Sequence, residues 1–271
     1  MHLVRQPAVA GAFYPGQASV LSNDVRLLLA EAKPDAGPAA QAPKALIVPH
    51  AGYIYSGSTA ALAYASLAGG RKSIRRVVLL GPVHRVAVQG LALPDVDSFA
   101  TPLGLVEIDQ DAIAAVASLP QVVVNRAAHA PEHSLEVQLP FLQLALDDFK
   151  LVPLAVGDAT PAEVAQVLSA LWGGPETLIV ISSDLSHFLP YQDAQSVDQE
   201  TLQSILHLSS TLSHHQACGS TPINGLLLAA RQHGLQAHLL GACNSGDTAG
   251  DRARVVGYAA IAFMPGDPDA H

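Results

Sequence analysis

Four short, almost entirely apolar runs recur along this chain, at residues 45–48, 76–80, 150–156 and 177–181. Runs of this length are typical of strands buried on both faces of a parallel sheet. Longer stretches with apolar residues at helical spacing lie between them. The alternation predicts an α/β fold of three layers, αβα, in which helices cover both faces of a largely parallel central sheet.

Weaker patterns complete the outline. Further strands are expected at 90–93, 105–108, 122–124, 237–240 and 255–263. Helices are expected at 23–32, 58–67, 109–119, 134–146, 161–172, 193–206 and 222–232. Thr160 and Glu163 form a capping box, and Pro140 predicts a kink in the helix that contains it. Residues 1–20 look extended, and the segment 33–44, rich in Pro, Ala and Gly, is typical of a loop.

A histidine follows three of the apolar runs. His50 comes after residues 45–48, His84 after residues 76–80, and His187 after residues 177–181. In open α/β sheets, ligands bind in the crevice outside the carboxyl ends of the strands. One such histidine is most often a buried structural residue. Three of them, if their strands are parallel in one sheet, converge on a single crevice.

His50 and His84 are the best pair of metal ligands. Neutral imidazoles suit zinc, copper, iron and nickel. Cys218 is the strongest candidate for a third ligand, because it lies just ahead of the helix expected from Pro222, and the positive end of a helix favours a thiolate. The alternative is a buried apolar cysteine. Cys243 is a weaker competitor, since no helix start is evident after it.

Several neighbouring residues are candidates for catalysis or for lining the pocket. His187, with Asp184 to orient it and raise its pKa, is a candidate general acid or base. Asp184 could equally cap a turn. His133 is either a further acid–base residue or a surface histidine near a helix start. Tyr53 and Tyr55 either line the pocket or pack in the core. Six other histidines lack a strand-end position and are expected to be structural or solvated: His129, His207, His214, His215, His233 and His238.

Composition narrows the class of protein. The 271 residues suffice for one large α/β domain, residues 1–271, although length alone also allows two smaller ones. Hydrophobic residues make up 49% and charged residues 14%, so much of the chain is expected to be buried. A net charge of −9 without a basic cluster argues against a nucleic-acid partner.

Two cysteines without a CxxC motif point to a reducing cytoplasm, and the first residues lack the apolar core of a signal peptide. Residues 45–70 are uncharged, but Pro49, His50 and several glycines argue against a membrane span. The chain has no P-loop, no GxGxxG and no GxSxG. Their absence weakens the hypotheses of a nucleotide-dependent protein and of a serine hydrolase.

Several motifs together resemble the Memo family, also called AmmeMemoRadiSam system protein B. They are Val48-Pro-His-Ala-Gly-Tyr53, Leu80-Gly-Pro-Val-His84, Glu132-His-Ser-Leu-Glu136, Ser182-Ser-Asp-Leu-Ser-His187 and Cys218-Gly-Ser-Thr-Pro-Ile223. Ala10-Gly-Ala-Phe-Tyr14 and Gly257-Tyr-Ala-Ala260 look similar too, so the resemblance covers nearly the whole chain. Ser220 and Thr221 depart from a more basic pair in the family pattern.

The resemblance implies a fold shared with class III extradiol ring-cleavage dioxygenases. It implies metal ligation by His50, His84 and Cys218, with Asp184, His187 and His133 around the pocket. A thiolate ligand favours copper, zinc or thiolate-bound iron over the usual two-histidine, one-carboxylate iron site.

Three hypotheses follow. The first is a metal-dependent oxidoreductase that uses iron or copper and acts on a small molecule. The second is a protein that binds metal or a peptide in the same pocket without turnover. The third, less favoured, is a zinc hydrolase. The family name also suggests radical SAM system partners.

Overall fold

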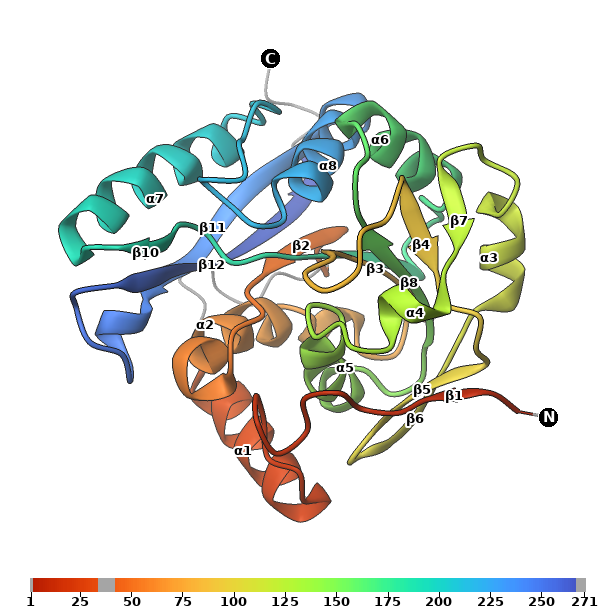
Figure 1. Cartoon of the computed structure of the whole chain (residues 1–271), viewed down its shortest axis with the longest axis horizontal. Helices are drawn as coiled ribbons and strands as arrows, with labels where there is room; N and C mark the ends of the chain where they lie inside the picture. Colours follow the sequence, from red (N-terminus) through yellow and green to blue (C-terminus); the bar gives the residue numbers. More distant parts are fainter. Residues whose placement is uncertain (1, 34–41, 267–271) are drawn as a thin grey trace.

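The structure, a computed structural model, describes residues 2–33 and 42–266. Most of the loop expected at 33–44 therefore lies outside the described residues. Within them, nine strands form one sheet in the order β10-β12-β2-β9-β3-β8-β4-β7, with β11 paired to β12 (Figure 1). These strands are β2 (Ala45–Val48), β3 (Arg76–Pro82), β4 (Leu91–Leu93), β7 (Val122–Val124), β8 (Lys150–Val156), β9 (Thr177–Ser182), β10 (His187–Leu189), β11 (Leu235–Asn244) and β12 (Val255–Pro265).

The centre of this sheet is parallel and its outer part is mixed. β2, β9, β3 and β8 run parallel to one another. β12 is antiparallel to β2, β11 and β10, and β4 is antiparallel to β8. The expected α/β architecture with a largely parallel sheet is confirmed. Its four central strands are the apolar runs that the sequence marks most clearly.

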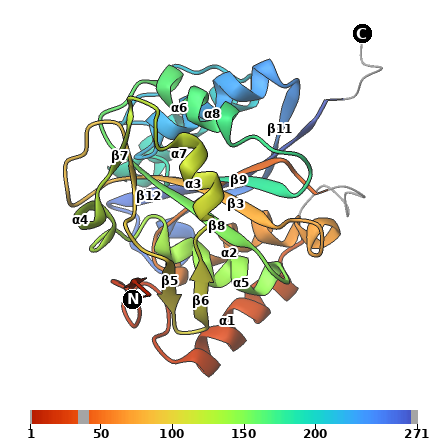
Figure 2. The ribbon, with the colours of Figure 1, turned by 90° about the vertical axis from the view of Figure 1, so that its right-hand side faces the viewer.

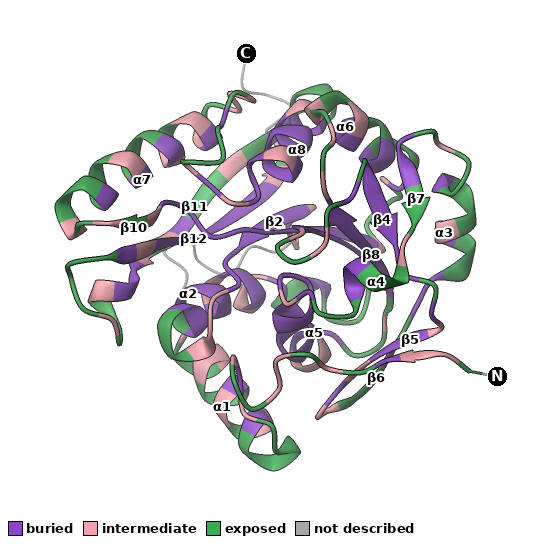
Figure 3. Ribbon diagram, viewed as in Figure 1, coloured by how far each residue is buried: buried purple, intermediate pink, exposed green. Residues whose placement is uncertain are grey.

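Helices cover both faces of the sheet (Figure 2). The helices on one face are α1 (Ala18–Glu31), α2 (Tyr53–Ala65) and α5 (Leu139–Ala145). Those on the other are α3 (Gln110–Val116), α6 (Pro161–Ala170), α7 (Tyr191–Leu206) and α8 (Ser220–Gln232). In β2, Leu46 and Val48 face the first layer, while Ala45 and Ile47 face the second. Figure 3 shows the result as fully buried central strands between helices with exposed outer surfaces.

The register of the central strands fixes where the site lies. Val48 of β2 pairs with Ser182 of β9, and Leu80 of β3 pairs with Ile181. The carboxyl ends of these three strands therefore meet at one edge of the sheet. The segments that carry His50 and His84 begin there, and so does the turn after β9.

Two helices begin earlier than their sequence patterns suggest. α2 starts at Tyr53 rather than near Ser58, and Gly52 at its N-cap makes no side-chain capping bond. The Tyr53 N–H instead donates to the carbonyl of Phe13 at 2.8 Å, a contact between distant segments that no local pattern reveals. α1 starts at Ala18, so the extended segment expected for residues 1–20 ends sooner.

Pro140 does not kink a helix. A short 3₁₀ turn, η2 (Glu136–Gln138), precedes α5, and Pro140 lies in the first turn of that helix. A proline is well tolerated there because its missing N–H would have had no partner within the helix. The expected helix at 134–146 is therefore two shorter elements, and residues 134–135 belong to a loop.

A small separate sheet combines the strand expected at 105–108 with two strands that the sequence patterns missed, β1 (Val4–Arg5) and β5 (Ser98–Thr101). β1 pairs parallel with β5, which pairs antiparallel with β6 (Gly104–Glu107). Short helical segments that complete the fold are η1 (Ala68–Gly70), α4 (Arg126–His129) and η3 (Ser245–Asp247). No helix in the described part of the chain is long and apolar enough to cross a membrane.

A buried ion pair ties the amino-terminal segment to the loop between α4 and η2. The Glu136 side chain is fully buried and accepts hydrogen bonds from Arg5, from the Tyr14 hydroxyl and from the amides of Ala8 and Val9. Arg5 also donates to the backbone carbonyls of His129, the last residue of α4, and of Glu132 in this loop. A buried carboxylate with this many donors is held in one position, and so is the loop beside it.

We expect Glu136→Gln to lower the free energy of unfolding by about 3–5 kcal/mol, because the substitution leaves the buried Arg5 guanidinium without its counter-charge. Urea unfolding measures the change. Asp148→Asn, at an exposed pair with Arg75, is the matched control and should change stability by less than about 0.5 kcal/mol. Equal effects of the two substitutions would show that the buried pair does not anchor the segment.

Candidate metal centre

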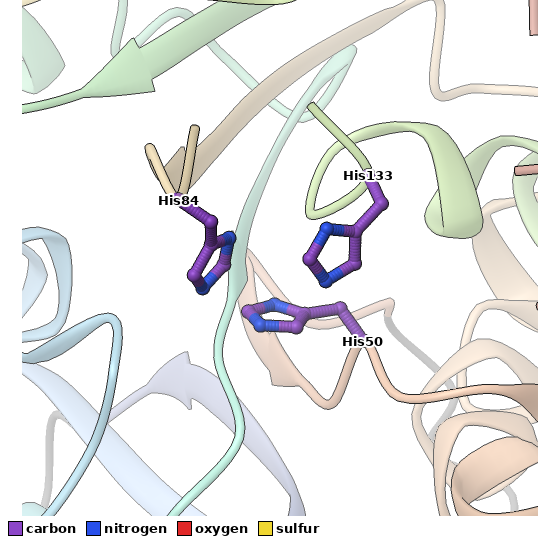
Figure 4. A group of neighbouring side chains, drawn as sticks. All are labelled: His50, His84 and His133. Atoms are coloured by element: carbon purple, nitrogen blue, oxygen red, sulfur yellow. The ribbon is translucent and has the colours of Figure 1, made fainter. Parts of the chain in front are cut away.

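Three imidazole rings converge at the carboxyl edge of the central strands. His50 follows β2, His84 follows β3, and His133 lies in the loop before η2. One ring nitrogen from each lies within 4.8 Å of one from each of the others. The ring centroid of His50 lies 5.3 Å from that of His84 and 5.4 Å from that of His133. The ring centroids of His84 and His133 are 4.8 Å apart. Figure 4 shows the three rings facing one another around a common point.

The hydrogen bonds of His50 determine which of its nitrogens carries the proton. Its Nδ1 lies 3.0 Å from the hydroxyl of Ser182. That hydroxyl donates its only proton to the carbonyl of Ser134 at 2.5 Å and accepts from the side-chain amide of Gln138 at 2.8 Å. His50 Nδ1 must therefore donate, so in the neutral ring Nε2 keeps its lone pair.

A buried carboxylate orients His84 so that, as in His50, Nδ1 is the donor. Its Nδ1 donates to Glu132 at 2.9 Å, and its backbone N–H donates to the other Glu132 oxygen at 2.6 Å. This arrangement fixes the ring and leaves Nε2 as the free nitrogen. A carboxylate behind a histidine is the usual outer partner of a metal-binding imidazole.

Glu132 also fixes the third histidine. Its carboxylate accepts the backbone N–H of His133 at 3.0 Å and that of Ser134 at 2.9 Å, and lies 3.4 Å from Nδ1 of His133. Burial, the largest single cause, raises the pKa of Glu132. The hydrogen bond from the His84 ring, the attraction of that ring and the backbone amide donors together outweigh burial, and the pKa of Glu132 falls to about 2. Glu132 is therefore ionised at neutral pH.

Burial keeps two of the rings neutral. Burial, and next the neighbouring His84, lower the pKa of His50 to about 3. Burial, and next the neighbouring His50, lower the pKa of His133 to about 4. Neutral imidazole is the form that binds metal. The three-histidine cluster could hold a transition-metal ion, and the donor set suits such an ion better than magnesium or calcium.

Cys218 lies against the His50 side of the cluster. Its Sγ is 3.3 Å from Nε2 of His50 and 3.7 Å from the carbonyl oxygen of Asp184. The expectation that a helix start favours the thiolate is wrong for the metal-free protein. Burial, and next the charge of Asp184, raise the pKa of Cys218 to about 12, because the loss of hydration exceeds the effect of the α8 dipole. α8 begins at Ser220, with Gly219 rather than Thr221 at its N-cap.

Asp184 and His187 lie next to the cluster but do not pair as expected. Asp184 is buried and accepts the backbone N–H of His50 at 2.7 Å, and burial raises the pKa of its carboxyl. His187 donates from Nδ1 to the carbonyl of Leu185 at 2.8 Å. The orienting group of His187 is therefore a backbone carbonyl, because His187 opens β10 and the chain turns there towards β12.

The two tyrosines expected at the pocket differ in their surroundings. The Tyr53 hydroxyl donates to the carbonyl of Val137 at 2.7 Å, and its ring packs 5.0 Å from that of Phe141. Tyr53 also lines a separate cavity beside α1, of about 590 Å³. Tyr55 is exposed on α2. Cys243 contacts the Thr59 hydroxyl at 3.1 Å and lines another cavity.

Sequence reasoning missed the residues that orient the rings. Glu132, Ser182 and Gln138 bond to ring nitrogens or to one another, yet all three come from different segments. Gly81 is also required, because a Cβ there would lie 2.9 Å from the Ser134 hydroxyl. The available signal was the pair of glutamates, Glu132 and Glu136, in a stretch (residues 127–146) with no other Asp, Glu, Lys or Arg, since buried carboxylates need dedicated partners.

Comparison with known proteins gives the same family along nearly the whole chain. The model of the Memo-like protein family matches residues 5–262. A MEMO1 family protein of Aquifex aeolicus is 37% identical over 275 residues, which cover 96% of this chain and 99% of that protein. A MEMO1 family protein of Ignicoccus hospitalis is 36% identical over 285 residues, with 96% and 99% coverage.

A solved structure supports the fold alone. The crystal structure of an uncharacterized protein from Escherichia coli K12 is similar with a TM-score of 0.51 at 15% sequence identity. The similarity covers 81% of this chain and 98% of that one. Identity at this level carries no information about activity. The family match and the full-length relatives, by contrast, are decisive: this chain belongs to the Memo-like protein family.

Proposed function

We propose that this chain is a metal-dependent oxidoreductase that holds an iron or copper ion with His50, His84 and Cys218. The observation that supports it most is the arrangement of outer hydrogen bonds, which engages Nδ1 of both His50 and His84 and directs Nε2 of each ring to the cluster. Among the described residues, the Cys218 thiol is the donor against Nε2 of His50, and no hydrogen bond reaches Nε2 of His84. Both lone pairs are therefore available to an ion once the thiol proton is lost.

The position of Cys218 supports its role as third ligand. Two ligands that share a tetrahedral ion at about 2.0 Å (nitrogen) and 2.3 Å (sulfur) lie roughly 3.5 Å apart. The separation of Cys218 Sγ and His50 Nε2 is 3.3 Å. Burial retains the thiol proton in the metal-free protein, and a bound ion would displace it. His133 is the competing third ligand, because its ring nitrogen belongs to the same cluster.

The remaining polar groups supply proton transfer and positioning. A bound iron or copper ion would contribute redox chemistry and open coordination positions for a small-molecule substrate. His187 donates from Nδ1 to Leu185, so its Nε2 can accept a proton from a substrate hydroxyl. Asp184 holds the backbone of His50 and keeps that ring in place. His133 is the second acid–base group when Cys218 completes the metal site.

Turnover is tested by oxygen uptake with catechols as substrates, on protein loaded with iron(II) or copper. The proposal predicts uptake that His50→Ala abolishes. Bound metal without uptake for any catechol would instead support a protein that binds metal or a peptide without turnover. Zinc in protein purified without added metal, together with ester or amide hydrolysis, would support a hydrolase.

The ligand set is tested separately from turnover by titration with each metal ion. We expect His84→Ala and Cys218→Ser each to weaken binding at least 100-fold, and Glu132→Gln to weaken it about 10–100-fold through loss of the outer hydrogen bond. His215→Ala, at an exposed histidine, is the control and should leave affinity unchanged. A large loss in His133→Gln with none in Cys218→Ser would assign the third ligand to His133 and overturn our assignment.

The neutral state of the buried rings predicts how stability depends on pH. The pKa values of His50 and His133, about 3 and about 4, lie below that of an unfolded histidine. Between about pH 6.5 and 4 the unfolded chain therefore takes up protons that the folded chain does not, and stability falls as pH falls. Each such histidine contributes a slope of up to about 1.4 kcal/mol per pH unit.

Urea unfolding of the metal-free protein across this range measures the slope. We expect His133→Gln to reduce it by up to about 1.4 kcal/mol per pH unit. The control is His215→Ala, which removes an exposed ring. A slope that is the same in His133→Gln as in the unsubstituted protein would mean that this ring is protonated in the folded state.

A further inference from the structure

A surface groove lies between α1 and α2, two helices that pack side by side (Figure 1). Its volume is about 590 Å³, and the segment 11–15 lines it together with the two helices. We call it the α1–α2 groove. His50, His84, His133 and Cys218 are not among the residues that line it. Binding in this groove therefore does not depend on the proposed function.

One face of α1 forms a wall of the α1–α2 groove. Four residues of this helix line it: Asp24, Leu27, Leu28 and Glu31. Residues spaced by three, four and seven positions lie on the same face of a helix. The two leucines are therefore placed between two carboxylates. At a rise of 1.5 Å per residue, Asp24 and Glu31 are about 10 Å apart along the helix axis.

Two large apolar side chains of the groove are exposed to water. Leu27 is 52% exposed, and Ile54, in the first turn of α2, is 71% exposed. Single apolar residues on a surface need no explanation, but apolar residues gathered in a groove with a polar rim are typical of an interaction surface. The α1–α2 groove has both features.

The groove carries negative charge that no neighbour neutralises. Neither Asp24 nor Glu31 forms an ion pair with a described residue. No lysine, arginine or histidine within residues 2–33 and 42–266 lines the groove. Arg26, the arginine of α1, donates to the Ser22 hydroxyl instead. An apolar stripe between two free carboxylates is complementary to an apolar segment flanked by two cations.

The elements around the groove favour a helix as the bound segment. No strand of the described residues lines the groove, so it offers no strand edge to an extended chain. A helix satisfies its own backbone hydrogen bonds and can lay an apolar face into such a groove. It also repeats the spacing of α1, so that one helical stripe can match the other along its length.

We propose that the α1–α2 groove binds a basic amphipathic helix of a partner protein. Lysine or arginine side chains seven residues apart on that helix would meet Asp24 and Glu31. Apolar residues between these cations would cover Leu27 and Ile54. A second copy of this chain fits less well, because two copies paired through α1 would place carboxylate against carboxylate.

A synthetic helical peptide of about 15 residues tests the proposal. It has lysines seven residues apart and leucines three and four residues after the first lysine, on an alanine-rich background. Fluorescence anisotropy of the dye-labelled peptide, titrated with the full chain, measures the Kd. We expect this lysine peptide to bind at least tenfold more tightly than a permuted peptide of the same composition, whose leucines no longer share a face with its lysines.

Matched substitutions in the protein locate the peptide. Asp24→Asn combined with Glu31→Gln should weaken binding about fivefold to tenfold, because two ion pairs at the rim are lost. Leu27→Ser should weaken binding about tenfold, because an apolar contact is lost. Leu105→Ser, at a leucine of β6 that is 56% exposed, and Glu200→Gln, at an exposed glutamate of α7, are the controls and should leave affinity unchanged.

Four results would overturn the proposal. No binding of the lysine peptide is the first, and equal affinity for the lysine and permuted peptides, which would show that charge alone attracts them, is the second. The third is unchanged affinity in Leu27→Ser and in the double carboxylate variant, which would place the peptide elsewhere on the protein. The fourth is self-association of the chain in sedimentation that Leu27→Ser abolishes, which would assign the groove to a second copy.

Discussion

The site depends on one constraint, the need of two buried carboxylates for partners. Glu132, in the loop before η2, and Glu136, the first residue of η2, are both almost completely buried. Such groups stay ionised only where donors replace the lost water. Glu136 obtains them from Arg5, Tyr14 and two backbone amides. Glu132 obtains them from His84 and from the amides of its own loop.

These two sets of hydrogen bonds join parts of the chain that are far apart in sequence. Glu136 ties the first residues to the loop, and Glu132 ties the loop to the end of β3. His133 lies between them, and the Phe13 ring packs 4.7 Å from its imidazole. The amino-terminal segment thus supports the histidine cluster although it contributes no ring nitrogen. The position of His133 is therefore set by two carboxylates that never face the common point of the three rings.

Much of the fold could be predicted from the sequence, because each central strand is a continuous apolar run that can be recognised from its own residues. The positions of His50 and His84 followed from the same runs, since each histidine comes just after a strand of a parallel sheet. Cys218 was chosen as the third-ligand candidate from its place just ahead of a helix, and the family resemblance favoured the same residue over Cys243. The contact of Cys218 with His50 agrees with that placement.

What the sequence could not supply was the set of contacts between segments. The start of α2 is fixed by the carbonyl of Phe13, about forty residues earlier in the sequence. The tautomer of His50 depends on Ser182, Ser134 and Gln138 acting together. The protonation of Cys218 was mispredicted because a helix start can be read from sequence, whereas the burial of a thiol cannot.

The central claim is that two imidazoles and one sulfur share an ion at this edge of the sheet. Anomalous diffraction from crystals of the protein loaded with copper or iron tests it most directly. The account predicts a single strong peak within about 2.0–2.3 Å of Nε2 of His50, Nε2 of His84 and Sγ of Cys218. Density for the ion elsewhere, or an ion bound to the three histidines with the sulfur of Cys218 turned away, would contradict it.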